Sequence, residues 1–203
     1  MLKKITSGIA AGIMVSIGGA VFLACENRIA GAVLFSVALL SICMAGYSLY
    51  TGKVGFLPEK HDKEAFSVLL LGLLGNTIGT ILSGLLIRYA FPASGEAAEA
   101  ICTAKLTQTF FGTLIRGTFC GILMYTAVKI NRDNRSPLGI LFCIPVFILS
   151  GFEHSIADIF YFAASGIVSL KAFVFILTVI LGNSIGGMLL PVLTGDFRKG
   201  GKS

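Results

Sequence analysis

Long apolar stretches separated by short polar ones run through the whole chain. A membrane-spanning helix needs about 20 predominantly apolar residues. Six segments have that length and composition, at Ile5–Ala24, Ile29–Leu49, Phe66–Ala90, Thr107–Val128, Pro137–Ala164 and Ala172–Leu193. No polar stretch between them is long enough for a separate soluble domain. The pattern therefore predicts an all-α membrane protein with six transmembrane helices, forming a single domain over residues 1–203.

Two of the six segments are interrupted by polar, glycine-containing sequences. Gly46–Gly52 (GYSLYTG) interrupts the second segment, and Ser150–Asp158 (SGFEHSIAD) interrupts the fifth. The second interruption places Glu153 and His154 beside Asp158 within an apolar region. Ionisable groups at bilayer depth are costly and usually face a protein interior or a water-filled path. The pattern predicts that the second and fifth helices are broken and that the fifth break lies at the centre of a pore.

The two halves of the chain echo each other. Gly75–Gly79 (GNTIG) lies in the third segment, and Gly182–Gly186 (GNSIG) lies in the sixth. Each half, at about 5–90 and 107–195, contains three segments, and an odd number of crossings inverts the second half relative to the first. Inverted repeats with broken helices near the midplane are a known transporter architecture. The echo predicts an inverted three-plus-three repeat.

Two asparagines stand out in these echoing sequences, Asn76 and Asn183. A side-chain amide can hydrogen-bond the backbone groups that a broken helix leaves unpaired. We expect both residues to brace the breaks; the alternative is that they are polar residues facing solvent.

Composition agrees with a membrane protein. Hydrophobic residues make up 55% of the chain and charged residues 13%, whereas soluble domains are about 25% charged. The mean hydropathy is +0.89. None of the five cysteines forms a pair with metal-ligand spacing, so packing is their expected role, and no cofactor or metal is expected. The basic N-terminus and first apolar run could be a signal peptide, but no clear cleavage site follows, so we expect the first span to be retained.

The net charge of +6 would suggest nucleic acid in a soluble protein, but here it predicts orientation. Loops on the side of the two termini hold Lys3, Lys4, Lys53, Lys60, Lys63, Lys129, Arg132, Arg135, Arg198, Lys199 and Lys202. The opposite side holds Arg28, Arg88, Lys105 and Lys171, while Arg116 lies inside a span. Cytoplasmic loops carry the excess of Lys and Arg. We therefore expect a multi-pass protein of the cell inner (plasma) membrane with both termini cytoplasmic and no nucleic-acid partner.

Two polar stretches are expected to be loops. Lys53–Glu64 predicts a solvated cytoplasmic turn, so His61 is not a candidate site residue. Phe91–Lys105 predicts the longest external loop.

Four motifs resemble those of the formate/nitrite transporter family. They are Gly151–Ala157 (GFEHSIA), Gly182–Gly187 (GNSIGG), Gly46–Gly52 and Arg116–Cys120 (RGTFC), within a similarity that runs from about Ile9 to Leu193. The resemblance implies a homopentamer of six-helix protomers in the lipid bilayer, each with an aquaporin-like fold and its own pore. Family members pass small monovalent anions or their conjugate acids, such as formate, nitrite, hydrosulfide and lactate.

The resemblance also assigns roles to individual residues. It implies that His154 is the central polar residue of the pore, that Thr51 faces it, and that Lys105 lends positive potential near the outer side. Glu153 and Asn183 match residues that hold the broken loops, and Asp158 and Asn76 are expected to assist them. Two apolar constrictions are implied at Phe35, Leu39, Leu49 and Phe147.

Three positions and the N-terminus depart from the family pattern. Family members commonly have an acidic residue at Ser48, and asparagine at both Gly121 and Asp158. Only about four residues precede the first span, so we expect a short member that lacks the usual N-terminal cytoplasmic helix. An extra carboxylate at Asp158 would favour a charged imidazolium if it lay close to His154.

These residues suggest a transport mechanism. The basic groups attract a weak-acid anion, which takes a proton from water or from His154 and crosses the apolar constrictions partly or wholly neutral. Thr51 and His154 supply hydrogen bonds midway. The expected substrate is formate-like or nitrite-like; the alternative is a channel for hydrosulfide, acetate or lactate.

Other interpretations of the same residues remain. His154 could be a buried histidine satisfied by Glu153 or by backbone, and Lys105 could be an ordinary interfacial lysine. Phe35 and Phe147 could serve helix packing alone. An intramembrane metalloenzyme would use His154, Asp158 and Glu153, but no second histidine lies in any span, so we do not expect an enzyme. A membrane subunit that only binds a partner is the last alternative.

Overall fold

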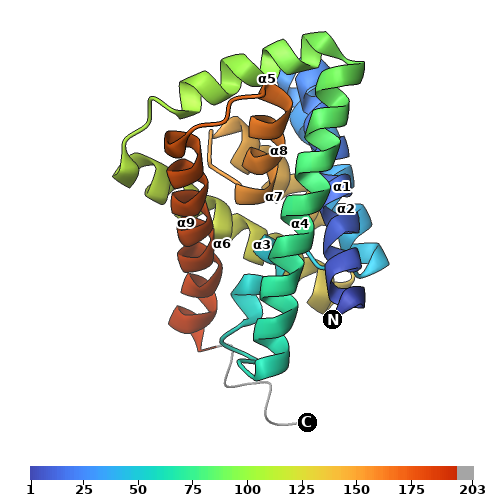
Figure 1. Cartoon of the computed structure of the whole chain (residues 1–203). Helices are drawn as coiled ribbons and strands as arrows, with labels where there is room; N and C mark the ends of the chain where they lie inside the picture. The colour runs from blue at the N-terminus through green and yellow to red at the C-terminus, as the bar shows by residue number, and fades with distance from the viewer. Residues whose placement is uncertain (196–203) are drawn as a thin grey trace.

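The computed structural model describes residues 1–195, and these form helices joined by short connections (Figure 1). Within residues 1–195, five helices are long and apolar enough to cross a membrane. They are α1 (Leu2–Ala24), α2 (Arg28–Ala45), α4 (Lys63–Ala90), α6 (Phe110–Asn134) and α9 (Leu170–Thr194). The predicted all-α membrane fold is confirmed for this part of the chain.

The remaining elements are short. Tyr50–Lys53 forms α3, followed by the 3-10 helix η1 (Val54–Phe56). The fifth apolar segment is divided into α7 (Leu138–Leu149) and α8 (Ser155–Ser165). The predicted breaks in the second and fifth segments are therefore confirmed, and the fifth apolar segment forms two shorter helices in place of one continuous helix.

Glycines in left-handed backbone conformation mark both breaks. Gly46 ends α2 with φ at 72°, and Gly151 follows α7 with φ at 68°. Glycine adopts positive φ at little cost because it has no Cβ. The chain can turn sharply at these points, and its next helix begins a few residues later inside the protein.

The expectation of an external loop at Phe91–Lys105 is wrong. Pro92–Lys105 forms the helix α5, with proline in its first turn, where its missing N–H costs nothing. Its buried residues, Gly95, Ala98 and Cys102, lie at spacings of three and four and so share one face. The segment is too polar for a span, but this narrow stripe of small residues is enough to pack against α8.

The two halves pack their outer helices in the same way. In the first half, a Cβ placed on Gly12 of α1 would overlap the carbonyl oxygen of Asn76 on α4. In the second half, a Cβ on Gly121 of α6 would overlap the carbonyl oxygen of Asn183 on α9. These equivalent contacts agree with the inverted repeat. They also give a physical reason for glycine at position 121, because the space between α6 and α9 admits no side chain there.

A Gly186→Ala substitution is expected to destabilise the protein by about 3 kcal/mol, the upper part of the usual range for overpacking. The added methyl group would overlap the carbonyl oxygen of Thr118, so α6 and α9 would have to separate. Gly72→Ala is the matched control on α4, because its Cβ would lie at 3.5 Å from Ser48, an ordinary contact. Thermal unfolding in detergent measures both; equal midpoints would refute the packing argument.

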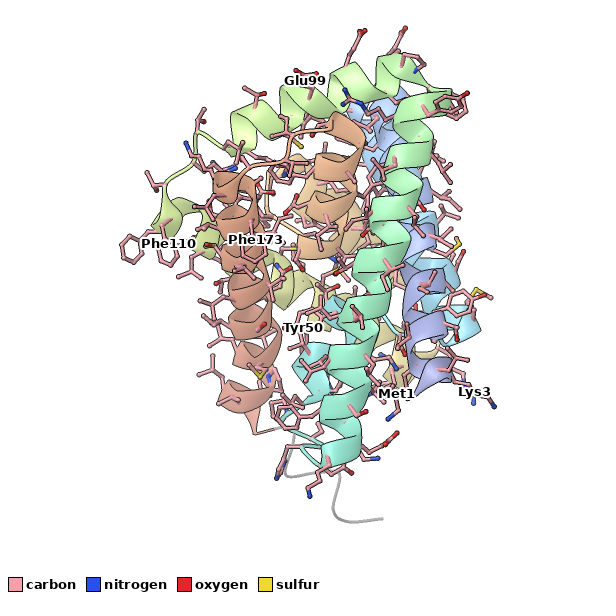
Figure 2. The ribbon with its side chains drawn as sticks, in the orientation of Figure 1. Met1, Lys3, Tyr50, Glu99, Phe110 and Phe173 are labelled. Carbon is pink, nitrogen blue, oxygen red and sulfur yellow. The ribbon has the colours of Figure 1, made fainter. Side chains whose placement is uncertain are left out.

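The two described ends of the chain lie on one side of the molecule. Figure 1 shows the start of α1, the end of α9 and the turn before α4 at the bottom, and α5 at the top. Figure 2 places Met1 and Lys3 at the bottom and Glu99 of α5 at the top. Asp62 caps α4 by accepting a hydrogen bond from the Ala65 N–H, which lowers the pKa of Asp62. Arg198, Lys199 and Lys202 of the predicted cytoplasmic set lie outside the described residues.

Candidate functional site

A hydrogen bond between Thr51 and His154 joins the two breaks at the middle of the protein. Thr51 lies in α3, and His154 is the residue immediately before α8. The Thr51 Oγ1 and His154 Nε2 atoms are 2.8 Å apart, and the residues are 1% and 4% exposed. One polar side chain from each half of the chain therefore meets the other in the interior of the protein.

The second ring nitrogen of His154 fixes the tautomer. Nδ1 accepts a hydrogen bond from the Ala157 N–H at 3.1 Å and so caps the N-terminus of α8. A nitrogen that accepts a hydrogen bond carries no proton, so in the neutral ring the proton lies on Nε2. His154 therefore donates to Thr51, and a charged imidazolium would lose the cap on α8.

Asn76 bonds three backbone groups around the first break. Its Nδ2 donates to the carbonyl oxygens of Gly8 and Ser48, each at 2.8 Å. Its Oδ1 accepts from the Tyr50 N–H at 2.9 Å. The Ser48 carbonyl and the Tyr50 N–H, which lie in the break, would otherwise be buried without partners, a costly condition in a membrane protein.

Asn183 repeats this arrangement around the second break. Its Nδ2 donates to the carbonyl oxygens of Gly117 at 2.9 Å and Glu153 at 2.8 Å. Its Oδ1 accepts from the Ser155 N–H at 2.9 Å. Both asparagines are completely buried. The same three bonds at equivalent positions tie each break to the outer helices of its own half.

Two cavities approach the Thr51–His154 pair from opposite sides. The α5-side cavity has a volume of about 120 Å³, and its lining includes Phe35, Phe147 and His154. The terminus-side cavity has a volume of about 280 Å³, and its lining includes Leu39, Leu49 and Gly52. The residues expected at two apolar constrictions therefore divide between two separate cavities, two in each.

Aromatic rings cover His154 on the α5 side. The Phe35 and Phe147 ring centroids are 6.2 Å apart at 85°, an edge-to-face arrangement. The Phe147 ring stacks on the His154 imidazole, with centroids 5.7 Å apart and planes at 25°. Both phenylalanines are 4% exposed. Both rings therefore line the α5-side cavity directly beside His154.

A charged cluster borders the α5-side cavity, with Lys105 and Asp158 in the cavity wall and Glu153 behind them. The Lys105 Nζ contacts Glu153 Oε2 and also Asp158 Oδ1, the latter at 3.0 Å. The Glu153 Oε1 accepts from Gln108 Nε2 at 2.7 Å. The Asp158 carboxylate thus pairs with Lys105, and within residues 1–195 no hydrogen bond or ion pair joins it to the His154 ring. Lys105 is therefore shared between two carboxylates.

Sequence reasoning missed two residues of this region. Gln108 holds Glu153, and the Arg88 guanidinium donates to the carbonyl oxygens of Ala164 and Ser165 at the end of α8. Arg88 was expected only as a loop charge. The position of Gln108 three residues after Lys105 was the one available signal for it; nothing in the sequence indicated the contact of Arg88 with α8.

The geometry gives no support to a metal site at His154. Both of its ring nitrogens are engaged, one with Thr51 and one with Ala157. Among the described residues, no group of three His, Cys, Asp or Glu side chains could hold a metal ion.

Comparison with known proteins places this arrangement in a family. The family model described as formate/nitrite transporter matches residues 1–195. The chain is 28% identical to a nitrite transporter of Salmonella typhimurium over 64% of this chain and 54% of the relative. It is 26% identical to the formate channel of Escherichia coli K12, over 78% of this chain and 65% of the relative.

The fold has a solved counterpart. A pentameric formate channel with formate bound superimposes with a TM-score of 0.82 at 23% identity, covering 98% of this chain and 97% of that one. The match to the nitrite transporter of Salmonella typhimurium spans about half of that protein.

Proposed function

Because the chain belongs to the formate/nitrite transporter family, we propose that it forms a transmembrane pore for small monovalent weak-acid anions such as formate or nitrite. The observation that carries this proposal is the Thr51–His154 hydrogen bond, which lies between two cavities that open toward opposite sides. The α5-side cavity is about 120 Å³, whereas a water molecule in the liquid takes about 30 Å³. That volume suits a small solute.

The apolar side chains of the two constrictions decide whether the charged or the neutral form of the solute crosses. A small anion is strongly hydrated in water, and hydrophobic constrictions exclude hydrated ions. Phe35 and Phe147 form such a barrier on one side, and Leu39 and Leu49 form it on the other. The anion of a weak acid lowers this barrier by taking up a proton, because the neutral acid that forms needs little hydration. The anion of a strong acid has no such route.

His154 acts as a hydrogen-bond donor in this proposal. Its Nε2–H donates to Thr51 and can donate to a solute oxygen instead, while Nδ1 keeps the hydrogen bond that it accepts from the Ala157 N–H. Giving up a proton would require the ring to be protonated on both nitrogens first, at the cost of the α8 cap. The geometry therefore favours water over His154 as the source of the proton that accompanies the anion.

The proposal includes assembly and orientation. A homopentamer in the lipid bilayer is supported by the pentameric formate channel that shares the fold. Placement in the cell inner membrane with both termini cytoplasmic is supported by the excess of basic residues on the side of the described ends. The terminus-side cavity, lined by Lys53 and Arg132, would then open toward the cytoplasm.

A flux panel with purified protein in liposomes tests the proposed function. We expect formate and nitrite uptake well above protein-free liposomes, faster at the lower of two pH values, and no chloride uptake. Acetate, lactate and hydrosulfide are measured in parallel, and a clear preference for one of them would select the alternative substrate class. The pore proposal is wrong if no anion crosses faster than in protein-free liposomes, and the partner-binding interpretation would then take its place.

A further inference from the structure

The charged cluster that borders the α5-side cavity contains one cation and two carboxylates. Lys105 contacts both Glu153 and Asp158, and the three side chains are 14%, 3% and 2% exposed. With every group ionised, the cluster carries a net charge of −1. A negative cluster that borders this cavity repels the anion that the pore is proposed to take, and the repulsion is strong because little water screens it.

The partners of the two carboxylates differ. Both oxygens of Glu153 are occupied, one by Lys105 and one by Gln108. Asp158 uses only Oδ1, and its buried Oδ2 has no hydrogen-bond partner within the part of the chain that the structure describes. A buried carboxylate oxygen without a partner is costly. Asp158 also lines the cavity with His154.

We propose that Asp158 is a proton-binding site of the α5-side cavity, where a proton on Oδ2 donates a hydrogen bond to the anion. The proton comes from water: the Asp158 carboxylate takes a proton from hydronium, forming a carboxyl group and releasing water. The net charge of the cluster then falls to zero, and the O–H points at the solute. Anion and proton bind together, and this inference rests on the proposed function because the anion is the solute of that pore.

The other groups around Asp158 do not take this role. Lys105 already donates to both carboxylates, and the Nδ1 of His154 is held by Ala157. Further titratable groups near the carboxylate are Cys102 of α5, Cys120 of α6 and Tyr161 of α8. Arg28 of α2 shares the cavity wall, Arg88 of α4 binds carbonyl oxygens at the end of α8, and Arg116 of α6 binds Gly151.

Asp158→Asn is the variant that isolates this proton. The amide can accept from Lys105 with its oxygen and donate to the anion with its nitrogen, so it imitates the protonated carboxyl group without exchanging a proton. Glu99→Gln is the matched control, because it makes the same chemical change on an exposed residue of α5 (Figure 2).

The experiment measures proton uptake when formate is added to purified protein in weakly buffered solution at fixed starting pH. We expect about one proton per bound anion in the wild type and in Glu99→Gln, and none in Asp158→Asn, by proton linkage. Formate flux in Asp158→Asn should match the wild type at low pH and exceed it several-fold at high pH. Equal proton uptake by the wild type and Asp158→Asn would overturn the inference.

Infrared difference spectroscopy provides a second measurement, made on the wild type and on the Asp158 variants. Adding formate should increase the protonated-carboxyl band, and this increase should be absent in Asp158→Asn or, if that variant misfolds, in Asp158→Ser. Formate flux without an increase in the protonated-carboxyl band would contradict the proton site at Asp158 but not the proposed pore. An increase in the protonated-carboxyl band without flux of any anion would contradict the proposed pore, while it would still support Asp158 as a site that binds a proton together with an anion.

Discussion

Formate flux is expected to fall by about 100-fold when His154 is replaced with phenylalanine. The new ring fills the same space between Thr51 and the Phe147 ring, but it lacks the Nε2–H donor and the Nδ1 acceptor. A lost hydrogen bond at a buried polar group costs about 1–3 kcal/mol, and a barrier raised by about 3 kcal/mol slows transport by about 100-fold. Uptake of labelled formate into liposomes measures the change.

His154→Asn is the matched control for this prediction. Asparagine is a good N-cap residue, so its oxygen can hold the Ala157 N–H while its amide donates to Thr51. It has no proton to exchange near neutral pH. We expect this variant to keep most of the flux and the pH dependence of the wild type. A variant that conducts but ignores pH would show instead that His154 itself supplies the proton.

Asn183→Leu is expected to cost about 5 kcal/mol of folding stability, as much as many proteins possess in total. The substitution leaves two buried backbone groups without partners, the Glu153 carbonyl and the Ser155 N–H, and removes a second hydrogen bond to the Gly117 carbonyl. Each such group costs about 1–3 kcal/mol. The yield of folded protein and the midpoint of thermal unfolding in detergent should both drop sharply.

Two further leucine variants test the cause of this effect. Asn76→Leu should be as damaging, because Asn76 makes the same three bonds in the first half. Asn131→Leu on α6 should be mild, because the Asn131 side chain donates one long hydrogen bond of 3.4 Å, to the Ser136 carbonyl. Similar midpoints for Asn183→Leu and Asn131→Leu would contradict the bracing role.

The pattern of the sequence was enough to predict the breaks and the repeat. Long apolar segments and their glycine-containing interruptions reflect local requirements, since a lipid-facing helix must be apolar and a sharp turn needs glycine. The same short sequence recurs around Asn76 and Asn183 because each half contains a broken helix, and the backbone groups at the break need hydrogen-bond partners. These features could be derived before any coordinates were known.

Other features depend on packing that leaves little trace in sequence. The helix α5 has a buried face of only Gly95, Ala98 and Cys102, too narrow to distinguish from a loop. The sharing of Lys105 between Glu153 and Asp158 joins residues about fifty positions apart. The tautomer of His154 follows from its cap on Ala157, which only the geometry reveals.

The central claim is that a weak-acid anion crosses the protein beside His154 and Thr51. Its most direct test is the initial rate of formate uptake by liposomes that contain wild-type protein, compared in one experiment with His154→Phe and with protein-free liposomes. The account predicts rapid uptake with the wild type and uptake near the protein-free level with the variant. Equal rapid uptake by wild type and His154→Phe would contradict it, because the solute would then cross without this residue.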